Sequence, residues 1–378
     1  MVAGETSGDM LAALLLRACQ QRWPGLQAHG IGGARMVEAG FRADWPSEKL
    51  AVRGYVEVLR HYREIVGIRR QLRDQLLQHK PDLFIGVDAP DFNLDLETSL
   101  KAAGIPTVHF ISPSIWAWRA ERIHQIGKAV DHVLCIFPFE PEIYARHGIA
   151  ATYVGHPLAA HIPMQPDMQQ ARLKLGLSPD AQVVAILPGS RSSEIKHIAP
   201  RFLAAAKWIA KQMAGSGRRV EFVLPAVPHV KPALEQAIHE AQMQDQIKLV
   251  DGQSHTVLAA CDVTLIASGT ATLEAALFKK PMVIGYAMPT LSWWIMRRKK
   301  LQPWVGLPNI LCGDFVVPEL LQDQCTPENL AREVCAWLSQ PERVQAVRER
   351  FARLHEQLNR DTGALATQAI AQVLGEGA

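Results

Sequence analysis

The chain has 378 residues, of which 48% are hydrophobic and 20% are charged. This balance is typical of a folded globular protein and excludes a largely disordered one. The formal net charge of +3 is too small to indicate a nucleic-acid partner, and no run of about 18 uncharged apolar residues predicts a membrane-spanning helix.

The first residues and the cysteines indicate a cytosolic protein. Met1 leads directly into residues 2–5, without the basic segment and apolar stretch of a secretory signal. The six cysteines are scattered and form no Cys-x-x-Cys pair, so we expect reduced thiols rather than disulfides or a zinc site. We therefore expect a cytoplasmic location and no metal cofactor, while peripheral contact with a membrane stays open.

Short apolar runs alternate with longer helical segments along the chain. Residues 9–22 predict a helix, with Leu11, Leu14, Leu15 and Ala18 on one face. This alternation predicts parallel strands joined by crossover helices. The expected strands are residues 83–87, 107–111, 132–136, 183–187, 220–224, 247–250, 263–266 and 282–284. A polar helical pattern closes the chain from residue 327.

A cluster of prolines divides this alternation into two halves. Pro157, Pro163, Pro166 and Pro179 fall close together among polar residues, which is typical of a connection between domains. We expect an α/β protein with two doubly wound Rossmann-like domains, residues 1–160 and 161–340, facing each other across a cleft. Residues 341–378 are expected to form a helical segment that packs back toward the N-terminal domain. Ligands bind such sheets at the carboxyl ends of their strands.

Two loops of the first half carry candidate functional residues. Residues 4–9, Gly-Glu-Thr-Ser-Gly-Asp, join a short strand to a helix, and such a turn offers free N–H groups to an anion or is simply capped by Ser7 or Asp9. Asp88 ends a buried strand, so its carboxylate is expected in the cleft, where partial desolvation suits a general base. The alternative is a helix cap, for which Asp91 or Asn93 is better placed. The spacing of Asp88 and Asp91 does not indicate a metal site.

A third segment, residues 113–119, combines paired tryptophans with an arginine. Trp116 and Trp118, beside Arg119, are suited to stack on a sugar or to contact a lipid. Core tryptophans beside a solvated arginine are the alternative, and the pattern alone favours that alternative.

Two glycine-containing loops of the second half are candidates for nucleotide binding. Residues 187–194 form a strand, a glycine loop and a helix start, so that Ser190, Arg191 and the helix N-terminus are expected to hold a pyrophosphate. A fixed cation there stabilises the leaving group of a sugar nucleotide as its charge grows. Residues 267–274 repeat the pattern. Their small residues Ser268, Gly269 and Thr270 permit close approach of a ligand, and Glu274 is placed to accept ribose hydroxyls or to face the helix dipole.

Adjacent tryptophans followed by cations mark a sixth segment. Trp293 and Trp294 precede four basic residues that include Arg297 and Arg298. Aromatic and basic residues together suit an anionic lipid surface, although a charge run is more often a solvated helix face.

These segments together resemble the lipid-A-disaccharide synthase family. The shared stretches are residues 2–9, 88–93, 112–119, 187–191, 267–270 and 307–309, in this order, and the resemblance extends from residue 2 to residue 360. Family members usually have several more apolar residues before the first of these stretches. Here only Met1, Val2 and Ala3 precede the loop, so we expect a short first strand in the central sheet.

The resemblance implies a GT-B fold and an inverting, metal-independent glycosyl transfer. The donor would be UDP-2,3-diacylglucosamine and the acceptor 2,3-diacylglucosamine 1-phosphate (lipid X), giving a β-1,6-linked disaccharide 1-phosphate and UDP. By this resemblance Asp88 is the base on the acceptor hydroxyl, Arg191 and Asn309 belong to the UDP side, and Glu5 and Ser7 are important polar residues. The role of Glu274 comes from the wider GT-B pattern.

The resemblance also implies an enzyme on the anionic inner-membrane surface of a Gram-negative bacterium. It is compatible with a homodimer. Two other hypotheses remain: a UDP-N-acetylglucosamine 2-epimerase-like enzyme, which needs no acyl chains, and a nucleotide-binding membrane-associated protein without activity. The aromatic and basic segments at 116–119 and 293–300 argue against the epimerase. The non-enzyme would need Arg191 but not Asp88.

Overall fold

The computed structural model describes residues 1–4, 6–50, 55–215 and 217–376. These residues divide into two compact units, one formed by residues 1–160 and 357–378 and the other by residues 161–356. The C-terminal segment expected from residue 341 is thereby shared between the two units. In the described part of the chain no helix has the length and apolarity needed to cross a membrane.

The first unit is built on a parallel sheet of seven strands in the order β3-β2-β1-β4-β5-β6-β7. Val2 and Ala3 of β1 pair with β4, and Val2 pairs with Ile31 of β2, so the short first strand is central in the sheet. The strands are β1 (Val2–Ala3), β2 (His29–Gly32), β3 (Arg42–Pro46), β4 (Phe84–Val87), β5 (Thr107–Phe110), β6 (His132–Cys135) and β7 (Ala151–Tyr153).

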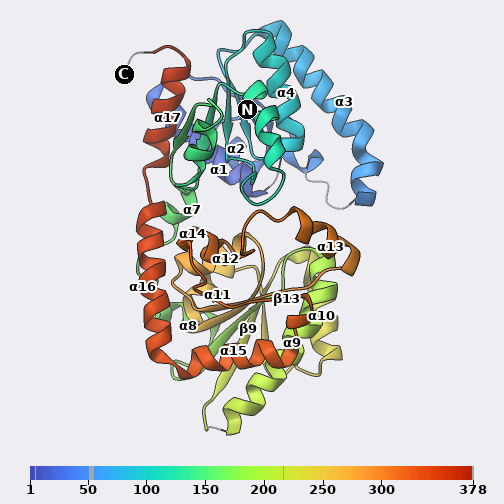
Figure 1. The fold of residues 1–378 in the computed structure, drawn as a ribbon, viewed down its shortest axis with the longest axis vertical. Coiled ribbons are helices and arrows are strands. Elements are labelled where there is room, and N and C mark those ends of the chain that lie inside the picture. Colours follow the sequence, from blue (N-terminus) through green and yellow to red (C-terminus); the bar gives the residue numbers. More distant parts are fainter. Residues whose placement is uncertain (5, 51–54, 216, 377–378) are drawn as a thin grey trace. The chain divides into compact units, whose positions relative to one another are not determined.

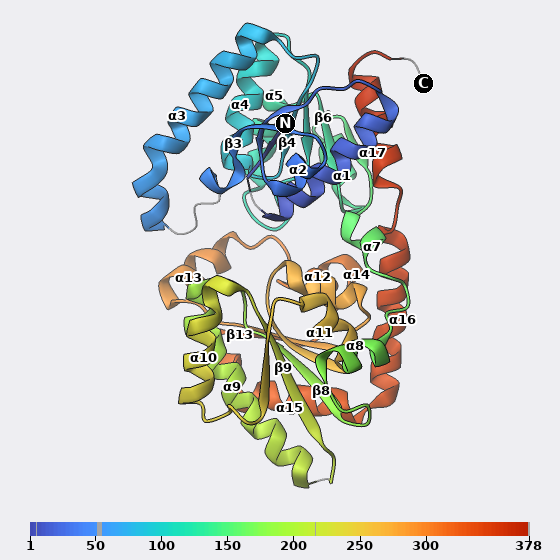
Figure 2. The same ribbon diagram turned by 180° about the vertical axis from the view of Figure 1, so that it is seen from behind.

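Helices cover both faces of this sheet. On one face α3 and α4 lie side by side, as both ribbon views show (Figures 1 and 2), and α5 packs against α4. On the other face α1 contacts α2 and α17. The helices of this unit are α1 (Thr6–Arg22), α2 (Ala34–Glu38), α3 (Tyr55–His79), α4 (Pro90–Ala102), α5 (Ile123–Ala129), α6 (Glu140–Ala145), α7 (Pro157–His161) and α17 (Thr362–Val373), with 3-10 turns η1 (Ser47–Lys49) and η2 (Ala120–Arg122).

The second unit repeats the architecture with a parallel sheet of six strands in the order β10-β9-β8-β11-β12-β13. Its central strands are almost wholly buried, as expected for a sheet covered on both faces. The strands are β8 (Gln182–Leu187), β9 (Val220–Ala226), β10 (Ile247–Asp251), β11 (Val263–Ala267), β12 (Met282–Tyr286) and β13 (Glu319–Leu321).

Two helical layers cover the second sheet. α9 contacts α10 and α15 on one face, while α11 contacts α8 and α12, and α12 contacts α14, on the other. Apolar residues three and four apart in α9, including Ile195, Ile198, Phe202 and Ile209, are buried, which explains how this helix is fixed to the sheet. The helices are α8 (Met168–Leu175), α9 (Ser192–Gly215), α10 (Lys231–Glu240), α11 (Ser254–Ala260), α12 (Thr270–Leu277), α13 (Thr290–Lys299), α14 (Leu307–Cys312), α15 (Pro327–Ser339) and α16 (Pro341–Leu358), with η3 (Pro228–Val230) and η4 (Gln322–Gln324).

Sequence signals explain where several helices begin and end. Asp167, Thr326 and Asp361 each accept a hydrogen bond from the backbone N–H three residues later and so cap α8, α15 and α17. Gly176 ends α8 in the left-handed conformation that glycine favours. The polar pattern expected from residue 327 is therefore divided into three helices rather than one.

All eight expected strands are observed, with ends within two residues of the prediction. Four observed strands beyond the short β1 were not predicted: β2, β3, β7 and β13. Three of them lie at sheet edges and β2 is second from an edge. They are short or interrupted by glycine or proline, so they lack the apolar run that marks a buried strand.

Candidate functional site

Each sheet has one point at which the strand order reverses, and the predicted loops follow the strands at that point. In the first sheet β1 and β4 are neighbours, with Ala3 paired to Val87; in the second, β8 and β11 are neighbours, with Leu187 paired to Ile266. Doubly wound sheets bind ligands outside the carboxyl ends of such neighbouring strands. Within each unit, therefore, two of the predicted loops meet at a ligand-binding position.

Asp88 follows β4 in an unusual backbone conformation. Asp88 and Ala89 have φ angles of 51° and 44°, in the left-handed region that non-glycine residues rarely occupy. The turn is held by two hydrogen bonds: the Asp88 N–H donates to the Phe110 carbonyl at 2.9 Å, and Asn93 Nδ2 donates to the Asp88 carbonyl at 2.8 Å. Such residues typically cost about 1–3 kcal/mol each and cluster at functional sites. The side chain of Asp88 is partly exposed.

The loop after β1 lies against the Asp88 turn. A Cβ added to Gly4 would lie 3.2 Å from the Cβ of Ala89, so a glycine permits this close approach. Glu5 lies outside the described residues. Ser7 belongs to α1, but its side chain is also outside the described part.

Asp9 has a different partner from either sequence interpretation. Its buried carboxylate accepts hydrogen bonds from the N–H groups of Gly33, Arg35 and Met36 at 2.9, 3.0 and 3.1 Å. Asp9 therefore caps the neighbouring helix α2 rather than its own helix. It joins α1 to α2 beside the first loop, and it is not available to a ligand.

The two tryptophans of the third segment face different environments. Trp116 is buried, its ring packs edge-on against Phe137 and Phe139, and its indole N–H donates to Glu140 at 3.0 Å. Trp118 is 45% exposed, with the Arg119 guanidinium over its ring at 4.3 Å. Trp116 is thus part of the core, and only Trp118 remains a candidate for lipid contact.

In the loop after β8 a carboxylate already occupies the expected anion position. Glu194 accepts hydrogen bonds from the N–H groups of Ser190 and Arg191 at 3.0 and 3.2 Å, and its other oxygen lies 3.4 Å from the Arg191 guanidinium. A side chain on Gly189 would collide with Glu194. This is one half of a capping box at the start of α9. Glu194 thus uses both N–H groups in this structure, and their use for phosphate stays a prediction, whereas the Arg191 side chain, 59% exposed, is accessible.

The loop after β11 begins α12 with small residues. Gly269 has a φ of 153°, Ser268 Oγ donates to the Val305 carbonyl at 3.3 Å, and Thr270 is the first residue of the helix. Glu274 lies one turn later, and its Oε2 is 3.3 Å from His255 Nε2 of α11. The Glu274 side chain is 21% exposed, so it is partly accessible.

Asn309 is fully buried, and its amide uses its full hydrogen-bonding capacity within the second unit. Nδ2 donates to the Val317 carbonyl and to Glu319 Oε1, at 2.9 and 2.8 Å. Oδ1 accepts from the N–H groups of Val316 and Val317, at 2.8 and 3.0 Å. Two donors and two acceptor positions are all that an amide offers. Asn309 therefore organises this loop, and the expected direct contact with UDP would require breaking one of these bonds.

Glu319 extends the Asn309 network to the segment before α14. Its carboxylate also accepts from the N–H groups of Val305 and Gly306 at 2.9 and 2.8 Å. Because Ser268 donates to Val305, the network reaches the loop after β11. Sequence reasoning missed Glu319, which stands in a polar stretch without a motif of its own.

The basic aromatic segment forms α13. Trp294 is 54% exposed, and the Arg298 guanidinium lies 3.5 Å from its ring centre. Trp293 is half-buried, whereas Arg297 is exposed. Met296 and Leu301 are also exposed. The segment thus presents apolar side chains and cations on one surface.

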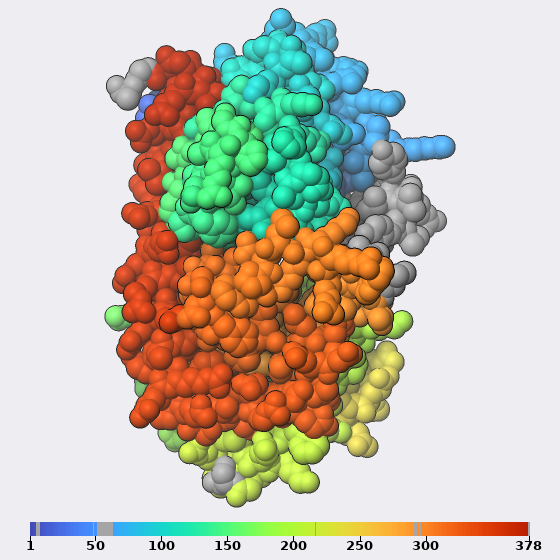
Figure 3. Space-filling view, in the orientation of Figure 1, coloured from blue at the N-terminus to red at the C-terminus, as the bar shows by residue number. Residues whose placement is uncertain are grey.

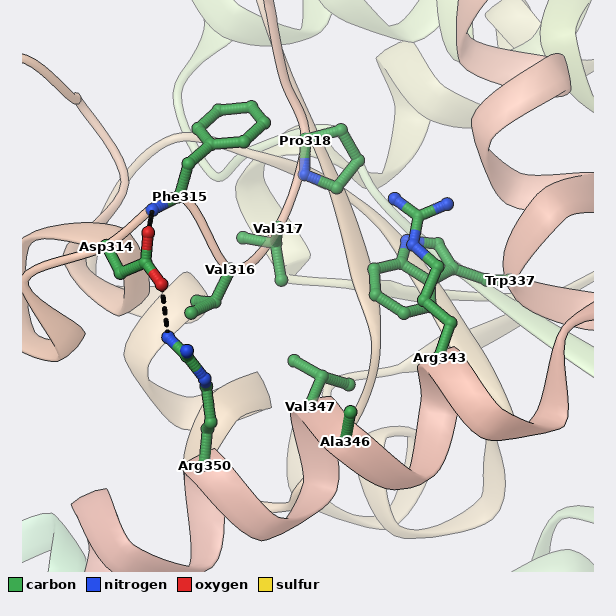
Figure 4. A pocket seen from close by; sticks show the side chains of 10 residues that line it. All are labelled: Asp314, Phe315, Val316, Val317, Pro318, Trp337, Arg343, Ala346, Val347 and Arg350. Carbon is green, nitrogen blue, oxygen red and sulfur yellow. Dashed lines mark hydrogen bonds and ion pairs between the residues drawn. The ribbon is translucent and has the colours of Figure 1, made fainter.

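A separate groove in the second unit contains none of the predicted residues. It has a volume of about 230 Å³ and lies between residues 314–318 and the helices α15 and α16. In the space-filling view the orange and red segments that form it adjoin on one surface of this unit (Figure 3). Its polar side chains are paired with one another: Arg350 lies 2.6 Å from Asp314, and Arg343 covers the Trp337 ring (Figure 4). We assign it no ligand.

Among the described residues no group of three or more His, Cys, Asp or Glu side chains is placed to hold a metal ion.

Solved structures show what fold the two units make. A putative UDP-N-acetylglucosamine 2-epimerase from Listeria monocytogenes aligns with a TM-score of 0.67 at 12% identity, covering 100% of this chain and 96% of that one. A UDP-GlcNAc 2-epimerase from Neisseria meningitidis, bound to UDP-GlcNAc, aligns with a TM-score of 0.64 at 13% identity over 97% of each chain. At such identities the likeness shows the fold, which is GT-B, and does not favour epimerase activity.

Sequence relatives are far more similar. The family model described as lipid-A-disaccharide synthetase matches residues 1–373. Lipid-A-disaccharide synthases from Albidiferax ferrireducens and Verminephrobacter eiseniae are 62% and 57% identical over 379 aligned positions, covering 99% of this chain and 96% of each relative. That from Thiobacillus denitrificans is 53% identical over 99% of both chains. The predicted resemblance is confirmed: the chain belongs to the lipid-A-disaccharide synthetase family of glycosyltransferases.

Proposed function

We propose that this glycosyltransferase joins UDP-2,3-diacylglucosamine to 2,3-diacylglucosamine 1-phosphate, forming a β-1,6-linked disaccharide 1-phosphate and UDP. The family membership supports this reaction. Inversion at the anomeric carbon follows if the acceptor 6-hydroxyl displaces UDP in one step. The O–C bond forms, the C–O bond to the pyrophosphate breaks, and the hydroxyl proton passes to a base.

The proposed base is Asp88. The observation that carries this assignment is the left-handed turn at the carboxyl end of β4, which fixes a partly exposed carboxylate at the reversal point of the first sheet. A neutral hydroxyl is a poor nucleophile, and a carboxylate placed to accept its proton typically contributes about 10²–10⁴-fold to the rate. The strained turn fixes the backbone at Asp88, and so the point from which its side chain projects.

The proposed UDP site is at the reversal point of the second sheet. The exposed guanidinium of Arg191 supplies positive charge for the pyrophosphate, and no metal ion is needed for that role in this proposal. Its contact with Glu194, at 3.4 Å, leaves the guanidinium exposed, so the guanidinium can also bond to phosphate oxygens. Ser268, Gly269 and Thr270 permit close approach, and Glu274 is proposed to accept bonds from the ribose.

The proposed location is the cytoplasmic surface of the inner membrane. Exposed Trp118 and the surface of α13 with Trp294, Arg297 and Arg298 support contact with anionic lipid. Both proposed substrates carry acyl chains, so a lipid surface is where they accumulate.

The test of this function is conversion of the two acylated substrates, followed by mass analysis of the lipid product. Wild-type protein should form the disaccharide 1-phosphate, and Asp88→Asn should lose about 10²–10⁴-fold in kcat while binding UDP with unchanged affinity. The Asn side chain keeps the shape of Asp, but its amide is too weak a base to accept the hydroxyl proton. Near-normal turnover by the variant would exclude Asp88 as the base. Formation of the disaccharide by wild-type protein, lost on replacement of Asp88, would exclude a nucleotide-binding protein without activity.

A further inference from the structure

A buried ion pair adjoins the turn that carries Asp88. Glu97 projects from α4 and His109 from β5, and His109 Nδ1 lies 2.8 Å from Glu97 Oε1, with both side chains fully buried. Gly86 and His109 are register partners on adjacent strands. A side chain on Gly86 would collide with Glu97 Oε1. The absence of a side chain at Gly86, two residues before Asp88, therefore leaves space for the buried carboxylate of Glu97.

Asn93 connects this pair to the turn itself. It lies one helical turn before Glu97 on α4, and its Nδ2 donates to the Asp88 carbonyl at 2.8 Å. A Cβ on Gly86 would lie 3.0 Å from the Cβ of Asn93, so the same glycine accommodates both side chains. The polar cluster and the left-handed turn are thus parts of one packed arrangement.

The electrostatics of the cluster connect His109 to Asp88. Burial alone would lower the pKa of His109, but the charge and hydrogen bond of Glu97, together with the charge of Asp88, raise that pKa above its ordinary 6.5. A buried carboxylate is costly without a partner, so a protonated His109 is favoured beside Glu97. Its positive charge in turn favours the ionised form of Asp88.

Other charged groups near the cluster have partners of their own. On α4, the outward-facing acids pair with arginines and a lysine pairs with an acid that precedes β6, while on the neighbouring strand β6 a buried histidine is bonded to a hydroxyl. These contacts are Asp91 with Arg122 and Arg119, Asp95 with Arg69, Asp131 with Lys101, and His132 with Thr152. On α1, Asp9 is bonded to backbone N–H groups. Among the described residues, Glu97 and Asp88 are the groups whose charges act on His109.

Three buried atoms of the cluster have no hydrogen-bond partner among the described residues: Asn93 Oδ1, Glu97 Oε2 and His109 Nε2. Buried polar atoms are nearly always bonded, and exceptions cluster where a role other than stability is served. An ion pair kept only for packing would be expected to satisfy its atoms. The incomplete bonding therefore points to a role for the cluster other than stability.

We propose that Glu97 and His109 are positioning residues for the general base, and that their ion pair holds Asp88 in the carboxylate form ready to take the acceptor proton. This inference rests on the proposed role of Asp88. Neither residue touches a reacting atom in this account; both act through the charge and the orientation of Asp88.

The experiment measures kcat/KM for disaccharide formation between pH 5 and 9. The variants are Glu97→Gln, which keeps the hydrogen bond but removes the charge that supports protonated His109, and Glu97→Gln with His109→Gln, which replaces both charged groups. We expect the acid limb of the profile to move to higher pH by up to about one unit in both variants, because the lost positive charge of His109 acts directly on Asp88, whereas the lost negative charge of Glu97 acts on it through His109. On that acid limb activity should fall by up to about tenfold for a shift of one unit, while the alkaline plateau stays within about twofold and UDP affinity is unchanged.

The matched control is His132→Gln, which replaces another buried histidine, at the start of the adjacent strand and bonded to Thr152. Its profile should keep the wild-type acid limb. A uniform loss at every pH, an unshifted limb, or loss of folded protein in both Glu97 variants would overturn the inference, because each outcome makes the pair a stability element. Failure of the proposed function is recognised separately, since wild-type protein would then form no disaccharide.

Discussion

Replacement of Asn309 separates an organising role from a ligand-contact role. In Asn309→Ala the N–H group of Val317 loses its acceptor, the N–H group of half-buried Val316 keeps only its bond to the Asp314 carbonyl at 3.0 Å, and the Val317 carbonyl and Glu319 lose a donor. A buried donor left without a partner costs about 1–3 kcal/mol. One such donor gives a destabilisation of about 2 kcal/mol, which is a fall of about 4–8 °C in Tm for a unit of this size.

The assay is thermal denaturation without nucleotide, followed by calorimetric titration with UDP. Asn329→Ala is the control, because Asn329 Nδ2 makes one exposed bond, to the Gln324 carbonyl at 3.1 Å, and its loss should change the free energy of unfolding by less than about 0.5 kcal/mol. If Asn309→Ala keeps a Tm within about 2 °C of wild type and loses only UDP affinity, the organising role is refuted and the amide is a direct ligand of the nucleotide.

Two further predictions concern the pH dependence of stability and the lipid surface. Burial lowers the pKa of His156 from 6.5 to about 4, so its contribution to the free energy of unfolding is present above pH 6.5 and is lost as pH falls toward 4, by up to about 3 kcal/mol at about 1.4 kcal/mol per unit. Urea unfolding at pH 4.5 and 7 should show a smaller loss in His156→Asn than in wild type, whereas exposed His147→Asn should behave like wild type; equal losses in all three proteins would contradict this. Replacement of Arg297 and Arg298 together by Gln should weaken binding to vesicles with anionic phospholipid by about 30-fold, since each cation near such a surface contributes about 1 kcal/mol. Replacement of the exposed Arg35 and Arg146 by Gln is the charge-matched control, and equal vesicle binding by both double variants would remove α13 from the lipid surface.

The sequence identified the elements that carry strong local signals. Buried apolar runs such as residues 183–187 predicted the central strands, and their alternation with helices predicted parallel doubly wound sheets. The loops at residues 4–9, 88–93, 187–194 and 267–274 were located correctly at the ends of those strands, because glycine and small residues mark such turns. Short edge strands such as β7 and β13 were missed, since three residues carry no periodicity.

Which side chains in those loops are available to a ligand was decided by tertiary contacts alone. Asp9 accepts hydrogen bonds from N–H groups at the start of α2, and Glu194 accepts them from the N–H groups expected to bind phosphate. The Asn309 amide makes all its hydrogen bonds within the second unit. Likewise Glu97 and His109 lie 12 residues apart in the chain, and no motif indicates that they pair. Hydrogen bonds and ion pairs depend on distances of about 3 Å between groups from different elements. Residue type and spacing along the chain determine the elements, but they do not encode those distances until the elements have packed.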